Sequence, residues 1–505
     1  MPGSDSSIHF QTATLTRDLT GRSVRGGLVT VGGQVLKVVA QTGAMALLAR
    51  LLHPESFGLI AMAAVIVTVL EMFKDLGLSA ATVQREEITH PEVSTLFWVN
   101  VGLGVVAALL MVLLAPLLAW FYHQPRLIGI TLWLGLGFVL SGLSTQHLAL
   151  LRRQMRFSAL AGIQMTAEIA GLTAAIVAAL MGADYWALVL QRIVWAGWLA
   201  AGGWIFCGWR PGPPMKLSAV RELLLYGGHI TGSNLVSTLV RSLDQILIGW
   251  WWGAVPLGLY ERAYKILLVP INNLNAPLFT VAMPMLSRLA KQPEAYRRAY
   301  LSMIEKLNMV VMPCAALLIA IPDQIVRALF GAQWLAAAPI VAWLGVAALY
   351  QPIAYTAGWL FMTQDRTREM FWWGMIGSAL SAVTIVAGMP FGATGVAASF
   401  AVGGLVIRLP VLFWMVGRRG PVSAWDMVKS LGPSSLAAGL IVVVLVALRR
   451  WDGFDALTLP RSLGLSGLSM ALVSGLCFVC VPQSRHALRE MIKVKDALGR
   501  RRVDA

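Results

Sequence analysis

Long apolar stretches alternate with short polar or basic segments along most of this chain. Residues 96–121 (LFWVNVGLGVVAALLMVLLAPLLAWF) carry no charge, and similar runs occupy 127–151 and 462–483. A hydrocarbon core about 30 Å thick requires roughly 20 consecutive apolar residues in a transmembrane helix. The pattern therefore predicts an all-α polytopic membrane protein.

Fourteen segments satisfy this length criterion, and together they leave room for short connections but for no large soluble domain. We place the fourteen transmembrane helices near 26–52, 57–80, 95–121, 127–151, 157–181, 185–208, 222–252, 256–286, 299–322, 333–361, 370–389, 393–416, 430–448 and 462–482.

The overall composition agrees with this prediction. Residues of the hydrophobic set make up 57% of the chain and charged residues only 13%, whereas soluble domains carry about 25% charged residues. The segment 1–25 lacks the apolar centre of a cleavable signal sequence. We therefore expect the first span to direct insertion.

The distribution of Lys and Arg predicts the orientation, because cytoplasmic loops of membrane proteins are enriched in both. With the N-terminus in the cytoplasm, 26 of the 40 Lys and Arg residues fall on the cytoplasmic side and six on the opposite side. Both termini are therefore predicted to be cytoplasmic. The net charge of +16 is dispersed over many loops, so it does not indicate nucleic-acid binding.

Two smaller features leave alternatives open. The basic tail 484–505 has apolar residues on one helical face, so it either lies on the anionic inner leaflet or forms a solvated helix. Cys477 and Cys480 have the spacing of a redox or metal motif. Because neither His nor an acidic residue lies nearby, we interpret them as small buried apolar residues and expect no metal or other cofactor.

The chain contains a weak internal repeat. Offsets of 200 to 212 residues superimpose three turns in the same order: 50–59 on 250–259, 152–157 on 364–369, and 182–187 on 392–397. Each half would hold six spans and enter the membrane in the same direction, as in transporters built from parallel repeats. The predicted parts are a cytoplasmic segment 1–25, an N-lobe 26–210, a C-lobe 211–420, an appendix of two helices 421–483 and the tail 484–505.

Polar residues recur at helical spacing on the first helix of each half. Burying an ionisable group in a bilayer costs roughly 3 kcal/mol or more, so such residues usually face a partner or a water-filled cavity. We interpret these two stripes as walls of a shared cavity, with polar packing between helices as the alternative. The stripes consist of Gln34, Lys37 and Gln41 on one helix and Asn234, Thr238, Arg241 and Gln245 on the other.

Further ionisable residues and prolines fall inside predicted spans. The cations are candidates for binding an anionic ligand, the carboxylates are candidates for coupling to Na⁺ or H⁺, and the prolines are candidates for a hinge. Glu71, Lys74 and Asp75 form either a structural ion cluster or part of a site. The additional candidate cations are Arg192, Lys265 and Arg408, the carboxylates are Asp244, Glu71, Asp75 and Glu168, and the hinge residues are Pro270 and Pro277.

The chain resembles the Wzx-type polysaccharide exporters, which are lipid-linked oligosaccharide flippases of the multidrug/oligosaccharidyl-lipid/polysaccharide superfamily. The resemblance rests on the stretches 241–249, 257–265 and 284–288, on Pro270, and on Gly58-Leu59 and Asp75-Leu76-Gly77-Leu78 in the first half. It implies two six-helix lobes around a central cavity. It also implies that an undecaprenyl-diphosphate-linked sugar repeat is moved from the cytoplasmic to the periplasmic leaflet of the bacterial inner membrane, driven by an ion gradient.

Two alternatives remain at this stage. A multidrug or cation antiporter of the same superfamily would share the two lobes, but cations in the cavity argue against a cationic cargo. A polysaccharide polymerase or ligase would need a sizeable periplasmic loop, and the longest extracytoplasmic connection, near 449–461, is short. The expected partners are the lipid-linked oligosaccharide and the bilayer, with a polymerase and a chain-length regulator as further candidates.

Overall fold

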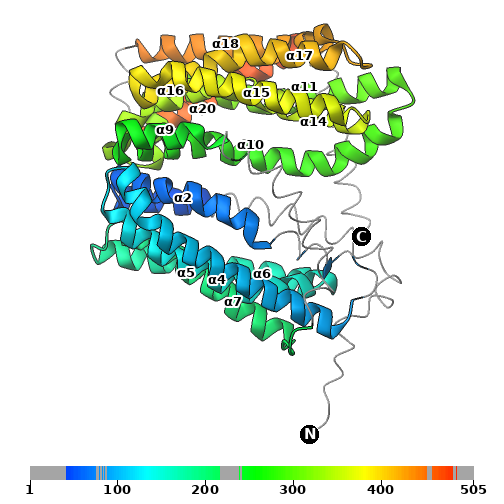
Figure 1. The fold of residues 1–505 in the computed structure, drawn as a ribbon. Coiled ribbons are helices and arrows are strands. Elements are labelled where there is room, and N and C mark those ends of the chain that lie inside the picture. Colours follow the sequence, from blue (N-terminus) through cyan, green and yellow to red (C-terminus); the bar gives the residue numbers. More distant parts are fainter. Residues whose placement is uncertain are drawn as a thin grey trace, which may run out of the picture. The chain divides into compact units, whose positions relative to one another are not determined.

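The computed structural model of this chain is helical throughout the part that it describes (Figure 1). Ten helical stretches among the described residues are long and apolar enough to cross a membrane. The prediction of an all-α polytopic membrane protein is therefore confirmed, whereas the number fourteen remains a prediction. The described residues are 41–75, 79, 82, 83, 85, 88–215, 238, 241–451, 458–481 and 485.

Contacts divide the chain into unit 1, Met1–Gly258, and unit 2, Leu259–Ala505. This division lies beyond the predicted lobe boundary at 210, because α9 packs against α2 in unit 1; the lobe boundaries remain a prediction.

In unit 1, α5 lies between α4 and α7, and α6 packs on α7. The long helices of unit 1 are α2 (Pro54–Asp75), α4 (His90–Phe121), α5 (Arg126–Arg153), α6 (Phe157–Leu180) and α7 (Trp186–Cys207), followed by the shorter α9 (Leu243–Trp252).

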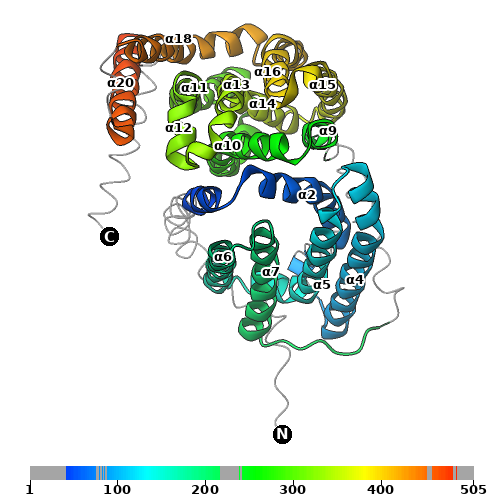
Figure 2. The same ribbon diagram turned by 90° about the vertical axis from the view of Figure 1, so that its left-hand side faces the viewer.

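Unit 2 is organised around α11, which contacts α13, α14, α18 and α20. Helix α18 packs along α11, and α20 lies beside α18 at the edge of this unit (Figure 2). The helix α10 (Ala254–Leu289) begins in unit 1 and continues into unit 2. The other elements are α11 (Pro293–Ala320), α12 (Pro322–Leu329), η4 (Ala332–Ala337), α13 (Ala338–Ala348), α14 (Gln351–Thr363), α15 (Thr367–Gly388), η5 (Met389–Phe391), α16 (Gly392–Gly403), η6 (Gly404–Arg408), α17 (Leu409–Gly417), α18 (Ala424–Arg449) and α20 (Leu459–Cys480).

Two predicted continuous spans differ from the structure. The segment predicted at 333–361 is divided into η4, α13 and α14, with a break at Leu349 and Tyr350. Pro352 follows this break in the first turn of α14, where its missing N–H breaks no intrahelical hydrogen bond. The segment predicted at 393–416 contains a π-helical stretch, Gly404–Arg408, between α16 and α17.

Local capping interactions determine where two of the long helices begin. At the start of α4, the Thr89 backbone N–H donates to Glu92 Oε2 at 2.7 Å. At the start of α18, Ser423 and Asp426 form a reciprocal pair, with N–H to side-chain oxygen distances of 3.0 and 3.1 Å. Such capping boxes satisfy backbone donors that have no partner within the helix.

The internal repeat is visible in backbone geometry. Met155 and Asp365 both have positive φ, 54° and 55°, and Gly182 and Gly392 have φ of 78° and 73°. Each pair is separated by 210 positions, so the turn at 152–157 corresponds to 362–367 and the predicted superposition on 364–369 is wrong by two residues. Positive φ is uncommon for residues other than glycine, so its recurrence at Met155 and Asp365 marks equivalent turns between equivalent helices.

The same offset relates two side-chain contacts. The Arg156 Nη1 donates to the carbonyl of Phe206 at 2.9 Å, and the Arg366 Nη1 donates to the carbonyl of Val416 at 3.0 Å. In each case an arginine from the turn before one helix, α6 or α15, binds a carbonyl at the end of a later helix, α7 or α17. The C-terminal carbonyls of a helix lack intrahelical partners, and a guanidinium satisfies them well.

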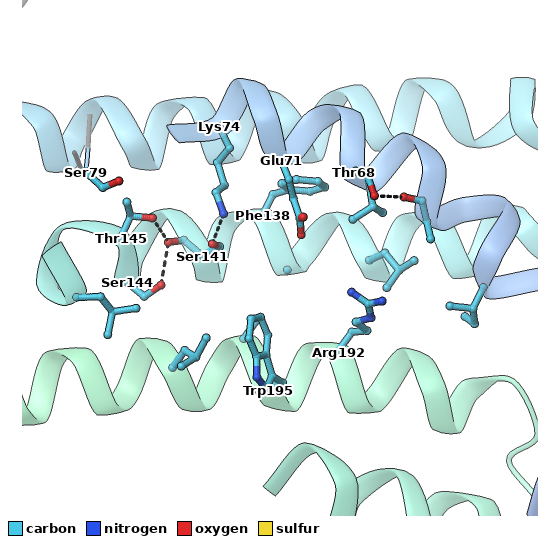
Figure 3. Close-up of a pocket in the computed structure, with 18 of the residues that line it drawn as sticks. Thr68, Glu71, Lys74, Ser79, Phe138, Ser141, Ser144, Thr145, Arg192 and Trp195 are labelled. Atoms are coloured by element: carbon cyan, nitrogen blue, oxygen red, sulfur yellow. Dashed lines mark hydrogen bonds between the residues drawn. The ribbon is translucent and has the colours of Figure 1, made fainter. Parts of the chain in front are cut away.

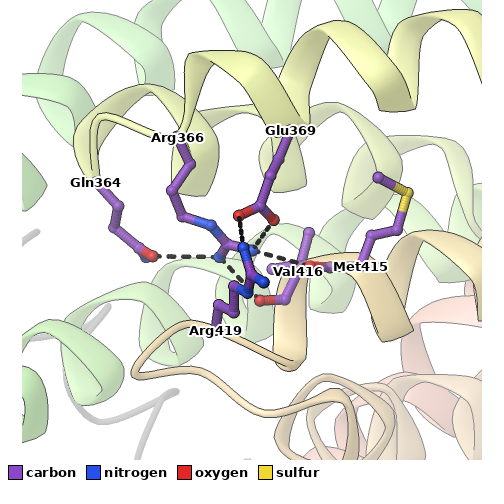
Figure 4. A network of polar contacts seen from close by, with 6 residues as sticks. All are labelled: Gln364, Arg366, Glu369, Met415, Val416 and Arg419. Carbon is purple, nitrogen blue, oxygen red and sulfur yellow. Dashed lines mark hydrogen bonds and ion pairs between the residues drawn. The ribbon is translucent and has the colours of Figure 1, made fainter.

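In unit 2 this contact is part of a buried network (Figure 4). The Arg366 side chain is 9% exposed; it also donates to the Met415 carbonyl at 2.9 Å and pairs with Glu369 Oε2 at 2.5 Å. Arg419 lies 3.8 Å from the other oxygen of the Glu369 carboxylate. Arg366 therefore joins the turn before α15 to the end of α17.

We expect Arg366→Ala to lower the free energy of unfolding by about 3 kcal/mol, because removing one partner leaves a largely buried carboxylate without its main counter-charge. Denaturant unfolding in detergent would measure this change. Arg368→Ala, in the same turn but exposed, is the matched control and should be nearly neutral. Equal stability of both variants would contradict this account.

Candidate functional site

In unit 1, a cavity of about 440 Å³ lies between α2, α5 and α7 (Figure 3). This volume lies within the range of small-molecule sites, which are about 300 to 1,000 Å³. Most of its wall is apolar, with a few charged and hydroxyl side chains. The polar lining residues are Thr68, Glu71, Lys74, Ser79, Ser141, Ser144, Thr145, Arg152 and Arg192.

Helix α2 contributes residues at helical spacing along one face. Ile60, Ala64, Val67 and Glu71 are separated by four, three and four positions, so they form a single stripe toward the cavity. In Figure 3 the Glu71 carboxylate points into the space between α2 and α7. The Lys74 ammonium, one turn further along, donates to the hydroxyl of Ser141 on α5.

Helix α5 contributes the hydroxyl groups. Ser144 Oγ and Thr145 Oγ1 donate to the backbone carbonyl of Ser141 at 2.9 and 2.8 Å. These bonds use the hydroxyl hydrogens and leave oxygen lone pairs for a donor from a ligand or water. Arg152, two turns further along, lines the same cavity.

Helix α7 contributes Arg192 and Trp195 on the opposite wall, and the Arg192 guanidinium points toward α2 (Figure 3). Across the described residues, neither Arg192 nor Glu71 has a hydrogen bond or ion pair. Among the described residues, three basic side chains and one carboxylate line the cavity, and these carry an excess of positive charge. Such a site favours an anionic ligand, and a guanidinium can bind a phosphate through two parallel hydrogen bonds.

The two predicted polar stripes are described only in part. Gln34, Lys37 and Asn234 lie outside the described residues, as does the side chain of Asp75. Gln41 is exposed on a helix covering 41–51.

On the second stripe, the Arg241 Nη2 donates to Thr238 Oγ1 at 3.2 Å, which agrees with their placement on one face. Gln245 is half-buried, one turn beyond Arg241. The described members of the stripes, Gln41, Thr238, Arg241 and Gln245, do not line the cavity between α2, α5 and α7. A shared cavity between the stripes remains a prediction.

The other predicted residues are distributed over both units. Asp244 is buried in α9 and accepts a hydrogen bond from the Gln245 backbone N–H at 2.8 Å. Glu168 lies on an exposed part of α6 and does not line the cavity. In unit 2, the Lys265 ammonium pairs with Glu261 at 2.5 Å. The helix α10 continues through Pro270 and Pro277, whose proposed hinge role is untested.

Arg408 lies at the end of the π-helical stretch in unit 2. Its guanidinium donates to the Tyr350 hydroxyl at 2.7 Å and to the Ser381 hydroxyl, and it lies 4.5 Å from the ring centroid of Phe400. These partners come from three different segments of unit 2. Arg408 therefore joins the helices of this unit, and its role toward a ligand remains a prediction.

Sequence reasoning missed part of the cavity. The sequence places Arg152 in the turn 152–157, after the predicted span 127–151, and nothing in it singles out Ser141, Ser144 and Thr145; all four line the cavity. Their spacing, together with Arg152, does form a stripe on one helical face. The signal is weak, because Ser and Thr within helices often bond to their own backbone carbonyls, as they do here.

Comparison with known proteins determines the family. Residues 47–339, more than half of the chain, match the family described as "Polysaccharide biosynthesis protein". The chain belongs to this family. The match covers the helices that line the cavity of unit 1 and extends into α13 of unit 2.

Curated relatives of the family agree with the predicted resemblance to Wzx-type proteins. The chain is 27% identical over 301 residues to the teichuronic acid biosynthesis protein TuaB of Bacillus subtilis, covering 59% of this chain and 62% of TuaB. It is 28% identical over 365 residues to the lipopolysaccharide biosynthesis protein WzxC of Escherichia coli, covering 70% of this chain and 73% of WzxC.

Two solved structures share the fold of this family member. The lipid II flippase MurJ, in an inward closed conformation, matches with a TM-score of 0.70 at 14% identity, covering 90% of this chain and 98% of MurJ. An inward-facing multidrug resistance MATE transporter of the MOP superfamily matches with a TM-score of 0.57 at 14% identity, covering 78% of this chain and 95% of the transporter. The chain therefore shares the fold of these two transporters.

Proposed function

We propose that this protein flips lipid-linked oligosaccharide repeat units across the bacterial inner membrane, from the cytoplasmic to the periplasmic leaflet. The observation that carries the proposal is the cationic cavity within a bundle of membrane helices, in a chain of the polysaccharide biosynthesis family. The anionic part of an undecaprenyl-diphosphate-linked sugar is a diphosphate, which Arg192, Arg152 and Lys74 suit chemically.

The proposed orientation places both termini in the cytoplasm, as the Lys and Arg distribution predicts. The end of the cavity near Arg152 then faces the cytoplasm, and the end near Ile60 faces the periplasm. The cycle proceeds by alternating access of two lobes and is driven by Na⁺ or H⁺, with Glu71 as the carboxylate placed in the cavity. A polysaccharide polymerase and a chain-length regulator are the proposed partners in assembly.

The second candidate function is multidrug or cation export, which the fold likeness to a MATE transporter favours. The charges of the cavity favour the first candidate. The three cations and one carboxylate among the described lining residues would repel a cationic drug, because like charges between cargo and site cost binding energy.

Deletion of the gene tests the proposal in cells whose assembly enzymes remain active. Lipid-linked repeat units are expected to accumulate on the cytoplasmic leaflet, since their synthesis continues while their translocation stops. Spheroplasts are treated with an external glycosidase, and their lipid-linked sugars are then fractionated. The share of lipid-linked sugar that is protected from the enzyme gives the amount on the cytoplasmic leaflet. Re-expression of the wild-type chain is the control. Undiminished surface polysaccharide together with new drug sensitivity would favour the second candidate.

A further inference from the structure

The end of α17 and the start of α18 in unit 2 carry two cations, each lying over an exposed indole ring. The Arg418 guanidinium carbon is 4.7 Å from the centroid of the Trp414 ring, and the Lys429 ammonium nitrogen is 5.6 Å from that of Trp425. The two indoles are 61% and 63% exposed. Because a cation within about 6 Å of an indole face is attracted by the ring, each ring holds its cation in place.

The two pairs lie at one corner of unit 2. A Cβ atom built on Gly417 would lie 2.5 Å from the backbone nitrogen of Ala424, so the end of α17 touches the start of α18. Arg418 directly follows the first of these residues, and Trp425 directly follows the second. We call residues 414–429 the indole corner.

Positive charge is in excess at the indole corner. The guanidinium groups of Arg366, Arg418 and Arg419 all interact electrostatically with the Glu369 carboxylate, which already pairs with Arg366 (Figure 4). A single carboxylate balances only one of the three guanidinium charges. Within the described part of the chain, the side chains of Arg418 and Lys429 have no hydrogen bond or ion pair.

The acidic residue of the indole corner is neutralised inside unit 2. Asp426 accepts a hydrogen bond from Arg297 Nε on α11 at 2.8 Å and another from the Ser423 backbone N–H at 3.0 Å. Its side chain is only 9% exposed. Asp426 therefore does not compensate the exposed cations.

Stacking leaves the donors of both cations available. A guanidinium that lies over a ring uses its face, and the N–H groups at its edge can still bind the oxygens of a phosphate in pairs. An ammonium has three donors, of which stacking directs only part toward the ring. The indole corner therefore presents positioned donors to an anionic group.

An apolar stripe extends from this corner along α18. Gly432, Leu436, Gly439 and Val443 follow Lys429 at intervals of three or four positions, so all five share one helical face. All five are exposed. A Cβ atom built on either glycine would meet no atom within 4 Å. The stripe thus alternates small and large apolar residues, which leaves shallow depressions for a hydrocarbon chain.

We propose that the indole corner binds the headgroup of an anionic phospholipid, with Arg418 and Lys429 as donors to the phosphate and an acyl chain along the stripe of α18. Indole rings are enriched where headgroups meet hydrocarbon, and basic residues at that depth attract anionic lipids. A soluble phosphate would gain nothing from the apolar stripe. The site is independent of the proposed function; its assignment to the cytoplasmic leaflet rests on the proposed orientation.

Native mass spectrometry of the purified full chain in dodecylmaltoside micelles tests the proposal. The protein is titrated with phosphatidylglycerol and, separately, with phosphatidylcholine carrying the same acyl chains. Phosphatidylglycerol is expected to bind about tenfold more tightly. The double variant Arg418→Gln with Lys429→Gln should weaken its binding about fivefold or more, because two charged donors are lost, and should leave the binding of phosphatidylcholine unchanged.

Two further variants separate the site from a general effect of charge. Arg288→Gln with Lys291→Gln also removes one arginine and one lysine, both exposed in unit 2 between α10 and α11. This matched control should bind phosphatidylglycerol as the wild type does. Trp414→Leu with Trp425→Leu keeps the charges but removes the rings that position them, and should weaken binding about threefold.

Equal affinity of the wild type and the Arg418/Lys429 variant for phosphatidylglycerol would overturn the proposal. A loss of the same size in the Arg288/Lys291 variant would also overturn it, because net charge alone would then explain binding. Glycerol 3-phosphate, the soluble part of the headgroup, should not compete with the lipid; full competition would reject a lipid as the ligand. None of these measurements uses the sugar cargo, so they do not depend on whether the proposed function holds.

Discussion

Arg192→Ala is expected to reduce export of lipid-linked sugar units about tenfold or more, with the protein still folded and inserted. The Arg192 guanidinium points into the cavity from α7 (Figure 3) and has no hydrogen bond or ion pair among the described residues. Its removal therefore breaks no internal bond. A hydrogen bond from a charged group to a ligand contributes roughly 1.5 to 3 kcal/mol. We therefore expect the substitution to reduce the binding free energy of the cargo and not the stability of the protein.

Surface polysaccharide and accumulated lipid-linked units, measured at matched protein level, would show this effect. Arg192→Lys keeps the charge without the guanidinium fork and should restore part of the export. Arg327→Ala removes an exposed arginine from α12 in unit 2 and is the matched control. Normal export by the Arg192→Ala variant would contradict the proposal that the cargo passes through this cavity.

Glu71→Gln is expected to lower export about tenfold and to remove the dependence of the remaining export on the ion gradient. Glu71 is the carboxylate that lines the cavity, and glutamine keeps its shape but can neither bind a cation strongly nor carry a proton at physiological pH. Coupling free energies between two ligands are typically 1 to 3 kcal/mol, which corresponds to roughly 5- to 150-fold effects.

Export measured with and without an uncoupler or a Na⁺ ionophore would show the loss of coupling. Glu168→Gln makes the same chemical change on α6, outside the cavity, and should leave the gradient dependence intact. The opposite pattern, with coupling lost only in the Glu168 variant, would move the coupling site to α6.

Much of the fold could be predicted from the sequence because membrane spans obey a simple length rule. The spans predicted at 127–151 and 157–181 correspond to α5 (Arg126–Arg153) and α6 (Phe157–Leu180) within two residues. The break at Tyr350 and the π-helical stretch before Leu409 were not predicted. The hydropathy of a segment does not reveal a turn or a π-helical stretch within it, because an interrupted helix can be as apolar as a continuous one.

The candidate site could be predicted less completely. The rarity of charges inside membrane spans distinguishes Glu71 and Arg192 in the sequence, and the structure brings both to one cavity. The same rarity distinguishes Lys265 and Arg408, but each of these binds partners in its own unit. A charged residue inside a span is expected to have a binding partner. Whether that partner is a ligand or a neighbouring helix is determined by side-chain contacts, which the sequence does not give.

The turns at Met155 and Asp365 share a backbone angle and an adjacent arginine contact, although the residues themselves differ in size, charge and polarity. If the two halves arose by duplication of an ancestral gene, selection has preserved the path of the main chain at this corner while the side chain was free to diverge. In such a protein, backbone torsion angles and hydrogen bonds to main-chain carbonyls then preserve the evidence of common descent better than amino-acid identity does.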